Sequence, residues 1–192
     1  MDDEMTSPDH LAKQFRDTIG TIPEPSVAPV EKWNPDFSGE MDMRIARNGD
    51  WFYKGNKLAR AALVKLFSTI LRKDDDGHYY LVTPVEKFRI TVEDAPFVAH
   101  SLEREGEGRD QLLWLTTNVG ERIPIDGDHP LEVSESPDND EPSPYICVRR
   151  NLHALVERQT FYELAALAQP GDVPGSLGIY SAGKFFLLGK AE

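Results

Sequence analysis

Apolar and polar residues alternate through the central part of the chain, which is the pattern of half-buried β-strands. The densest block covers residues 76–99, DGHYYLVTPVEKFRITVEDAPFVA, and further alternating runs follow it after turns rich in Gly, Asn and Asp. The predicted strands are 78–85, 87–92, 97–103, 111–116, 121–125 and a weaker 131–133. Strands joined by such short turns pair most simply as antiparallel neighbours.

Other strands are predicted on both sides of this block. Residues 41–45 and 51–53 alternate around Asn48-Gly49, a dipeptide that supplies the positive φ values of a tight hairpin turn. A short strand covers 145–148, and a last hairpin is predicted over 176–189.

Three segments carry apolar residues at helical spacing. The first, 8–20, has a narrow apolar stripe of Leu11, Phe15 and Ile19. Such a stripe fits a helix docked on a larger body or, alternatively, a helix that binds a partner. The other two helices are predicted over 55–71 and 149–168.

The second and third predicted helices superimpose when the sequence is shifted by 94 residues. Phe67 then falls on Phe161, and Trp51 falls on Tyr145. The match predicts an α+β fold of two similar halves, each a small, mostly antiparallel sheet with one packed helix, and chance similarity is the alternative. The predicted parts are an N-terminal helix (1–20), a Pro-rich connector (21–39), a first half (40–95) and a second half (96–192) with an acidic loop (126–143).

Composition excludes several classes of protein. The net charge of −12, from 33 acidic and 21 basic residues, disfavours nucleic acid and anionic lipid as main partners. No run of about 18 apolar residues is present, so no membrane span is predicted. A single cysteine, Cys147, and an acidic N-terminus without an apolar run predict a cytoplasmic protein.

Motifs of catalysis and cofactor binding are mostly missing, and no metal site or cofactor is predicted. The segment from Gly178 to Lys184 matches most of the phosphate-loop pattern, but Phe185 stands where that loop requires Ser or Thr. We interpret it as a hairpin turn. The five histidines are scattered, and no paired cysteines accompany them.

Polar residues around two prolines form one candidate ligand site. Pro84 removes a ladder N–H and bends the strand, so Thr83 and Glu86 are positioned to face a cleft. Glu93 and Asp94 repeat the arrangement after the next strand. Ordinary turn chemistry, in which these side chains bind local amides, is the alternative.

Arg149 and Arg150 form a second candidate, at the predicted start of the third helix. The helix dipole favours acidic residues there, so two guanidinium groups beside free amides suggest a phosphate pocket. The alternative is that these arginines pair with the acidic loop just upstream.

Two of these segments resemble a bacterial family known as domain of unknown function 1285. The specific pieces are TPVEK at 83–87 and VEDAPF at 92–97, and weaker similarity covers most of residues 40–168. The resemblance implies a duplicated α+β core whose C-terminal half is superficially similar to a pleckstrin-homology fold. It also implies a nucleotide-type ligand between the halves and a signalling role. Carried over by position, the ligand-binding residues are Thr83, Glu86, Lys87, Glu93, Asp94, Pro96, Phe97 and Arg149.

The sequence is compatible with three functions. The first is a non-enzymatic sensor of a phosphate-bearing small molecule, in which Arg149 holds the anion and Trp51 or Phe97 offers a stacking face. The second is a hydrolase acting on a nucleotide, with Glu86, Glu93 or Asp94 as general base or metal ligand. The third is a protein–protein interaction module that uses the acidic loop and the first helix.

Overall fold

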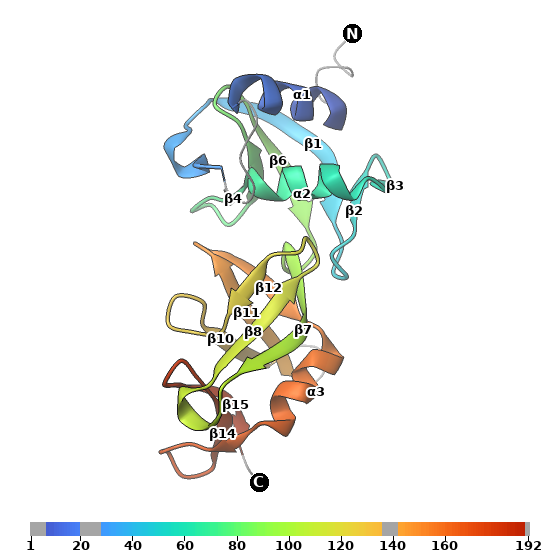
Figure 1. Ribbon diagram of the computed structural model, residues 1–192. Coiled ribbons are helices and arrows are strands. Elements are labelled where there is room, and N and C mark those ends of the chain that lie inside the picture. Colours follow the sequence, from blue (N-terminus) through green and yellow to red (C-terminus); the bar gives the residue numbers. More distant parts are fainter. Residues whose placement is uncertain (1–6, 20–27, 136–141, 191–192) are drawn as a thin grey trace. The chain divides into compact units, whose positions relative to one another are not determined.

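The alternating segments of the chain form two six-stranded sheets, one in each of two units, Met1–Glu93 and Asp94–Glu192. The structure is a computed structural model that describes residues 7–19, 28–135 and 142–190 (Figure 1).

The first unit holds a sheet with the strand order β3-β2-β1-β6-β5-β4. Neighbouring strands are antiparallel except for the central pair, β1 and β6, which runs parallel. The strands are β1 (Phe37–Ile45), β2 (Trp51–Tyr53), β3 (Asn56–Lys57), β4 (Leu71–Lys73), β5 (Tyr79–Val82) and β6 (Lys87–Val92). The helical segments are α1 (Pro8–Ile19), η1 (Val30–Lys32) and α2 (Ala61–Thr69).

The core of the first unit lies between the sheet and α2. Trp51 of β2 is 1% exposed and stacks on Phe67 of α2, with 6.2 Å between ring centroids. On the other flank, Arg72 of β4 donates to the carbonyls of Val30 and Trp33 at 2.9 and 2.7 Å. These bonds fix residues 30–33 against the edge strand β4 and cover part of that edge.

The second unit holds a sheet with the order β10-β11-β12-β7-β8-β9, and its central pair, β12 and β7, is again parallel. The strands are β7 (Phe97–Glu105), β8 (Leu112–Thr117), β9 (Arg122–Pro124), β10 (Leu131–Glu135), β11 (Pro142–Arg149) and β12 (Leu152–Val156). They are followed by α3 (Arg158–Ala166) and a small sheet of β13 (Gln169–Pro170), β14 (Ser176–Ser181) and β15 (Lys184–Lys190), with η2 (Gly108–Asp110) between β7 and β8.

Buried hydrogen bonds join the two sheets of the second unit. The amide of Gln111 donates to the Tyr180 carbonyl at 2.8 Å, and the Leu113 N–H donates to the Ser181 hydroxyl at 3.0 Å. Helix α3 contacts both β7 and β14, so it packs where the two sheets meet.

The predicted fold class is confirmed, since each unit combines a mostly antiparallel six-stranded sheet with a helix. Both sheets follow one plan, in which the first and sixth strands of the unit form the parallel central pair. The packed helix stands at a different place in each unit. In the first unit α2 lies between the third and fourth strands, and in the second unit α3 follows the sixth strand. In this plan β1, which begins at Phe37, corresponds to β7, which begins at Phe97. The two units are therefore related by an offset of 60 residues rather than 94.

The third predicted helix was wrong at its start, because its first part is strand β12. Leu152, Ala154 and Val156 are buried while the residues between them are half-buried, which is strand periodicity. Arg150 adopts a positive φ of 51° in the β11–β12 turn. Since that turn lacks the glycine that usually marks such a conformation, the pattern suggested a continuous helix. Arg149 ends a strand, and the predicted helix-end amides beside it do not exist.

The other predicted boundaries shift for local reasons. Helix α2 begins at Ala61 rather than near Gly55, because Lys54 and Gly55, both at positive φ, form the β2–β3 turn. Strand β1 already begins at Phe37, inside the predicted connector, whose residues 21–27 lie outside the described part of the chain. Most of the described part of the predicted acidic loop is strand, since β10 and β11 pair across it.

The two hairpins predicted around glycine turns are confirmed. Strands β1 and β2 pair antiparallel, with Ile45 opposite Trp51. Strands β14 and β15 pair through a turn at Ala182 and Gly183, so the near-match to a phosphate loop is a hairpin. Among the described residues, no helix is both long enough and apolar enough to cross a membrane.

Candidate functional site

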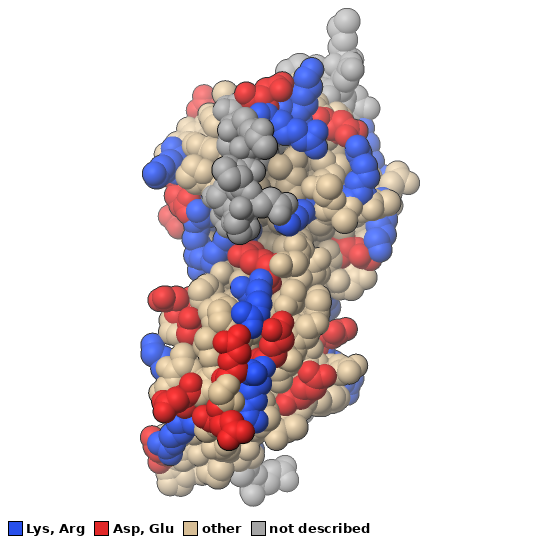
Figure 2. Space-filling model, in the orientation of Figure 1, with Lys and Arg blue, Asp and Glu red and all other residues tan. Residues whose placement is uncertain are grey.

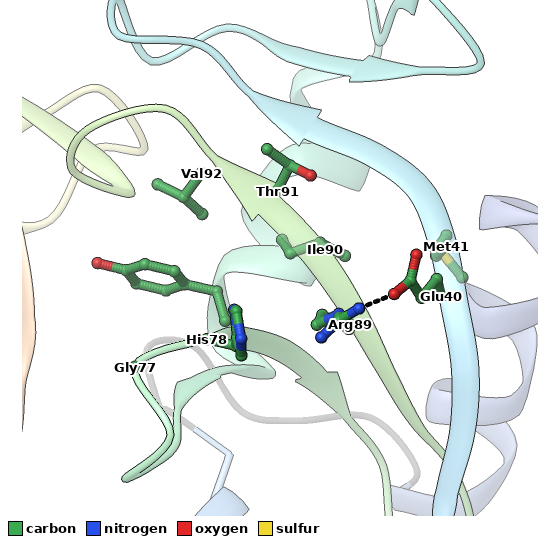
Figure 3. A pocket seen from close by; sticks show the side chains of 9 residues that line it. Glu40, Met41, Gly77, His78, Arg89, Ile90, Thr91 and Val92 are labelled. Atoms are coloured by element: carbon green, nitrogen blue, oxygen red, sulfur yellow. Dashed lines mark ion pairs between the residues drawn. The ribbon is translucent and has the colours of Figure 1, made fainter.

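A pocket of about 420 Å³ opens on the first unit (Figure 3). It is formed by β1, the turn that leads into β5 and the C-terminal part of β6. The lining residues are Glu40, Met41, Gly77, His78, Tyr79, Arg89, Ile90, Thr91 and Val92.

An ion pair between Glu40 and Arg89 joins neighbouring strands in the pocket lining, and Figure 3 shows the two side chains pointing toward one another. The pairing follows from the sheet, because the Cα atoms of Glu40 in β1 and Arg89 in β6 are register partners. Both side chains meet solvent, with exposed fractions of 65% for Glu40 and 37% for Arg89. The pair is therefore accessible to a molecule in the pocket.

Strand periodicity explains why polar groups gather here. In β6, Arg89 and Thr91 alternate with Phe88 and Ile90, which are buried at 3% and 5% exposed. Sheet pleating sends the polar residues to the face opposite the core. On the neighbouring β1, Glu40 precedes the buried Met41 in the same alternation.

The pocket contains none of the nine ligand-binding residues predicted from the sequence. The Glu40–Arg89 pair joins positions 49 residues apart through a parallel β1–β6 contact, and strand patterns predict strands without predicting such partners. The only sequence signal was the alternation within each strand, which places Glu40 and Arg89 on exposed faces.

The predicted residues Thr83 and Glu86 form a turn. The Thr83 hydroxyl oxygen accepts from the Glu86 N–H at 3.0 Å, and the Thr83 N–H donates to the Glu86 carbonyl at 2.9 Å. Thr83 is fully buried, so these bonds match the turn-chemistry alternative. Oε2 of Glu86 is buried with no hydrogen-bond partner among the described residues, which the turn does not explain.

Other predicted residues of the first unit have internal partners. The Lys87 ammonium donates to Asp74 at 3.1 Å and lies 4.6 Å from the Tyr80 ring centroid. Glu93 accepts from the Arg47 N–H at 3.0 Å and pairs with Arg44. These bonds, the one from Arg47 first, hold the pKa of Glu93 below its ordinary value. Trp51 cannot offer a stacking face, because its ring is buried against Phe67.

The remaining predicted residues belong to the second unit. Asp94 accepts from the Tyr145 hydroxyl at 2.7 Å, and Pro96 is buried. Arg149 donates to Glu121 at 2.6 Å, and its guanidinium lies 5.1 Å from the centroid of the fully buried Phe97 ring. One partner of Arg149 is thus Glu121 of the β8–β9 turn, which lies outside the predicted acidic loop.

Charged side chains of both signs lie on the surface of each unit. On the face drawn in Figure 2, basic and acidic groups alternate and no continuous basic patch covers either unit. Among the residues that the structure describes, no three His, Cys, Asp or Glu side chains gather as a metal site would need.

Family models match nearly all of the described chain. Residues 28–95 match the N-terminal domain of the domain of unknown function DUF1285, and residues 96–188 match the C-terminal domain of the DUF1285 protein of unknown function. The chain belongs to the DUF1285 family. The predicted resemblance is thereby confirmed, and the two matched domains correspond to the two units, whose boundary falls after Glu93.

Solved structures of DUF1285 proteins agree with this assignment. A DUF1285 family protein from Silicibacter pomeroyi DSS-3 is 43% identical in sequence. The match covers 96% of this chain and 95% of that protein's chain, with a TM-score of 0.85. A DUF1285 family protein from Shewanella baltica OS155 is 33% identical in sequence. The match covers 64% of this chain and 89% of that protein's chain, with a TM-score of 0.50. Among curated proteins, no match was found.

Proposed function

We propose that this DUF1285 protein is a non-enzymatic binding module for a small, nucleotide-type or other phosphate-bearing molecule, with a signalling role in the cytoplasm. The observation that carries the proposal is the pocket of the first unit, whose lining includes Arg89, His78 and Thr91. The cytoplasmic setting is inferred from the single, buried and unpaired Cys147.

The chemistry of the pocket suits such a ligand. Its volume of about 420 Å³ falls within the usual range of small-molecule sites. Arg89 supplies a planar set of donors for oxygen atoms of the ligand, and His78 and Thr91 add further polar groups.

The hydrolase alternative finds less support in the carboxylates that were predicted for it. A general base works best with a pKa near the operating pH, whereas that of Glu93 is lowered by its bonds to Arg47 and Arg44. One oxygen of Asp94 is engaged by Tyr145.

Thermal unfolding of the full chain against mononucleotides, cyclic dinucleotides and inorganic phosphate tests the proposal. A ligand at 100 times its Kd stabilises a protein by about 2.7 kcal/mol, which raises Tm by several degrees. We expect such a shift with a phosphate-bearing ligand and its loss in Arg89→Gln. The matched control is Arg60→Gln, an exposed arginine of the same unit that pairs with Asp9 and lies outside the pocket lining.

A further variant separates the pocket from the site predicted by sequence. Arg149→Gln changes the second unit alone, so its ligand-induced shift, measured from its own Tm, should equal that of the wild type. Loss of the shift in Arg149→Gln but not in Arg89→Gln would overturn the pocket assignment. The absence of any shift across the panel would overturn the binding function.

A further inference from the structure

The pocket contains a carboxylate where a purely anionic ligand would be repelled. Glu40 is 65% exposed and lies beside Arg89, the only Lys or Arg in the described lining. A phosphate placed on Arg89 would compete with Glu40 for the same guanidinium and would approach a like charge. The ligand that fits both residues carries donors for Glu40 as well as acceptors for Arg89.

We propose that the Glu40–Arg89 pair recognises the base of the ligand and selects guanine. This inference rests on the proposed function and specifies the ligand of the same pocket. The Watson–Crick edge of guanine presents two neighbouring N–H donors, N1–H and the N2 amino group, next to the acceptor O6. A carboxylate accepts both donors, and an adjacent guanidinium donates to O6.

The sheet places these two groups side by side. Because Glu40 and Arg89 are register partners on β1 and β6, they extend from one face of the sheet and meet as an ion pair. Guanine can lie against both groups without separating them, and Arg89 keeps a charged partner throughout. The phosphate of the nucleotide is then left to other polar groups of the lining, among them His78.

Other bases satisfy this pair less well. Adenine presents an acceptor at N1 and one amino group, so it leaves Glu40 without its paired donors and sets its amino group toward Arg89. Hypoxanthine keeps N1–H and O6 but lacks the N2 amino group. Because a hydrogen bond to a charged group contributes about 1.5–3 kcal/mol, each lost donor should weaken binding by about tenfold or more.

Titration calorimetry of the full chain with GMP, IMP, AMP and inorganic phosphate tests the selection. We expect GMP to bind at least about tenfold more tightly than IMP, and AMP to bind more weakly still. In Glu40→Gln the preference for GMP over IMP should disappear. Its control is Asp42→Asn, a change at another exposed acid on β1 that lies outside the pocket lining.

The outcomes distinguish this inference from the function on which it rests. Equal binding of GMP, IMP and AMP, lost in Arg89→Gln, would overturn guanine selection and leave the binding function intact. A GMP preference that survives in Glu40→Gln would also overturn the inference. No binding of any of the four probes would reject the selection, and the wider ligand panel above then decides the binding function.

Discussion

Two arginine–glutamate pairs, one in each unit, differ in what surrounds them. Arg149 and Glu121 are 12% and 33% exposed, and the Arg149 guanidinium lies over the buried ring of Phe97. Arg89 and Glu40 are 37% and 65% exposed and line a pocket. The Arg149 pair is packed into the body of its unit, whereas the Arg89 pair is accessible to a ligand.

The burial of an arginine–glutamate pair decides whether it stabilises the fold or is accessible to a ligand. Sequence reasoning favoured Arg149 because it expected free helix amides beside it, but Arg149 ends strand β11 and contacts Glu121 and Phe97. Nothing in the sequence marks Arg89, because one arginine in an alternating strand is usually solvated. We therefore expect changes around Arg149 to alter stability, and changes around Arg89 to alter binding.

The largest expected effect concerns the ring beneath Arg149. Phe97→Ala removes a fully buried aromatic side chain and should lower the free energy of unfolding by about 3–5 kcal/mol. Urea denaturation of the purified chain, followed by circular dichroism, measures the change. Phe37→Ala is the control, because Phe37 is 56% exposed and should lose less than about 1 kcal/mol. Equal losses in the two variants would contradict the packed role of Phe97.

The Arg149–Glu121 pair should give the next largest effect. Arg149→Gln leaves Glu121 without its charged partner in a partly buried site, and we expect a loss of about 1–3 kcal/mol. The double variant with Glu121→Gln should lose less than the sum of the two single variants, because the interaction is removed only once. Strict additivity in urea denaturation would show that the two residues stabilise the unit independently.

Local sequence patterns predicted most of the strands but not how they pair. The turns at Asn48-Gly49 and Ala182-Gly183 were found because glycine marks them, whereas the β11–β12 turn passes through Arg150 and was missed. The candidate site depends on the parallel contact of β1 with β6, which closes a loop through α2 and four other strands. Short-range periodicity contains no information on such a contact, so Glu40 and Arg89 could not be matched from the sequence.

A third ion pair, Arg72–Asp74, is about as buried as the Arg149 pair and gives the first unit an acid-sensitive contact. Burial alone would raise the pKa of Asp74, but hydrogen bonds from Arg72 and Lys87 outweigh it and hold the pKa below its ordinary value of 3.8. The stabilisation is therefore complete above the unfolded-state pKa and is lost as the pH falls through the lower folded-state pKa.

The measurement is the difference in unfolding free energy between wild type and Asp74→Asn, from urea denaturation at a series of pH values. We expect a positive difference at pH 6 that shrinks below about pH 4 as the wild-type carboxyl is protonated. Asp75→Asn, at an exposed neighbouring residue, controls for the loss of one negative charge. A difference for Asp74→Asn that stays constant from pH 6 to pH 3 would show that its contacts do not depend on ionisation.

The smallest expected effect on stability belongs to the pocket pair itself. Ion pairs with side chains this exposed contribute about 0–1 kcal/mol, because water solvates both charges when the pair opens. Arg89→Gln and Glu40→Gln should therefore each change the unfolding free energy of the ligand-free protein by less than about 1 kcal/mol. A loss as large as that of Arg149→Gln would mean that Arg89 and Glu40 support the sheet, and that their effect on binding is indirect. A binding pair differs from a structural pair in that its loss leaves the unfolding free energy nearly unchanged but abolishes stabilisation by the ligand. The contrast in exposure between the two pairs predicts this result for Arg89 and Glu40.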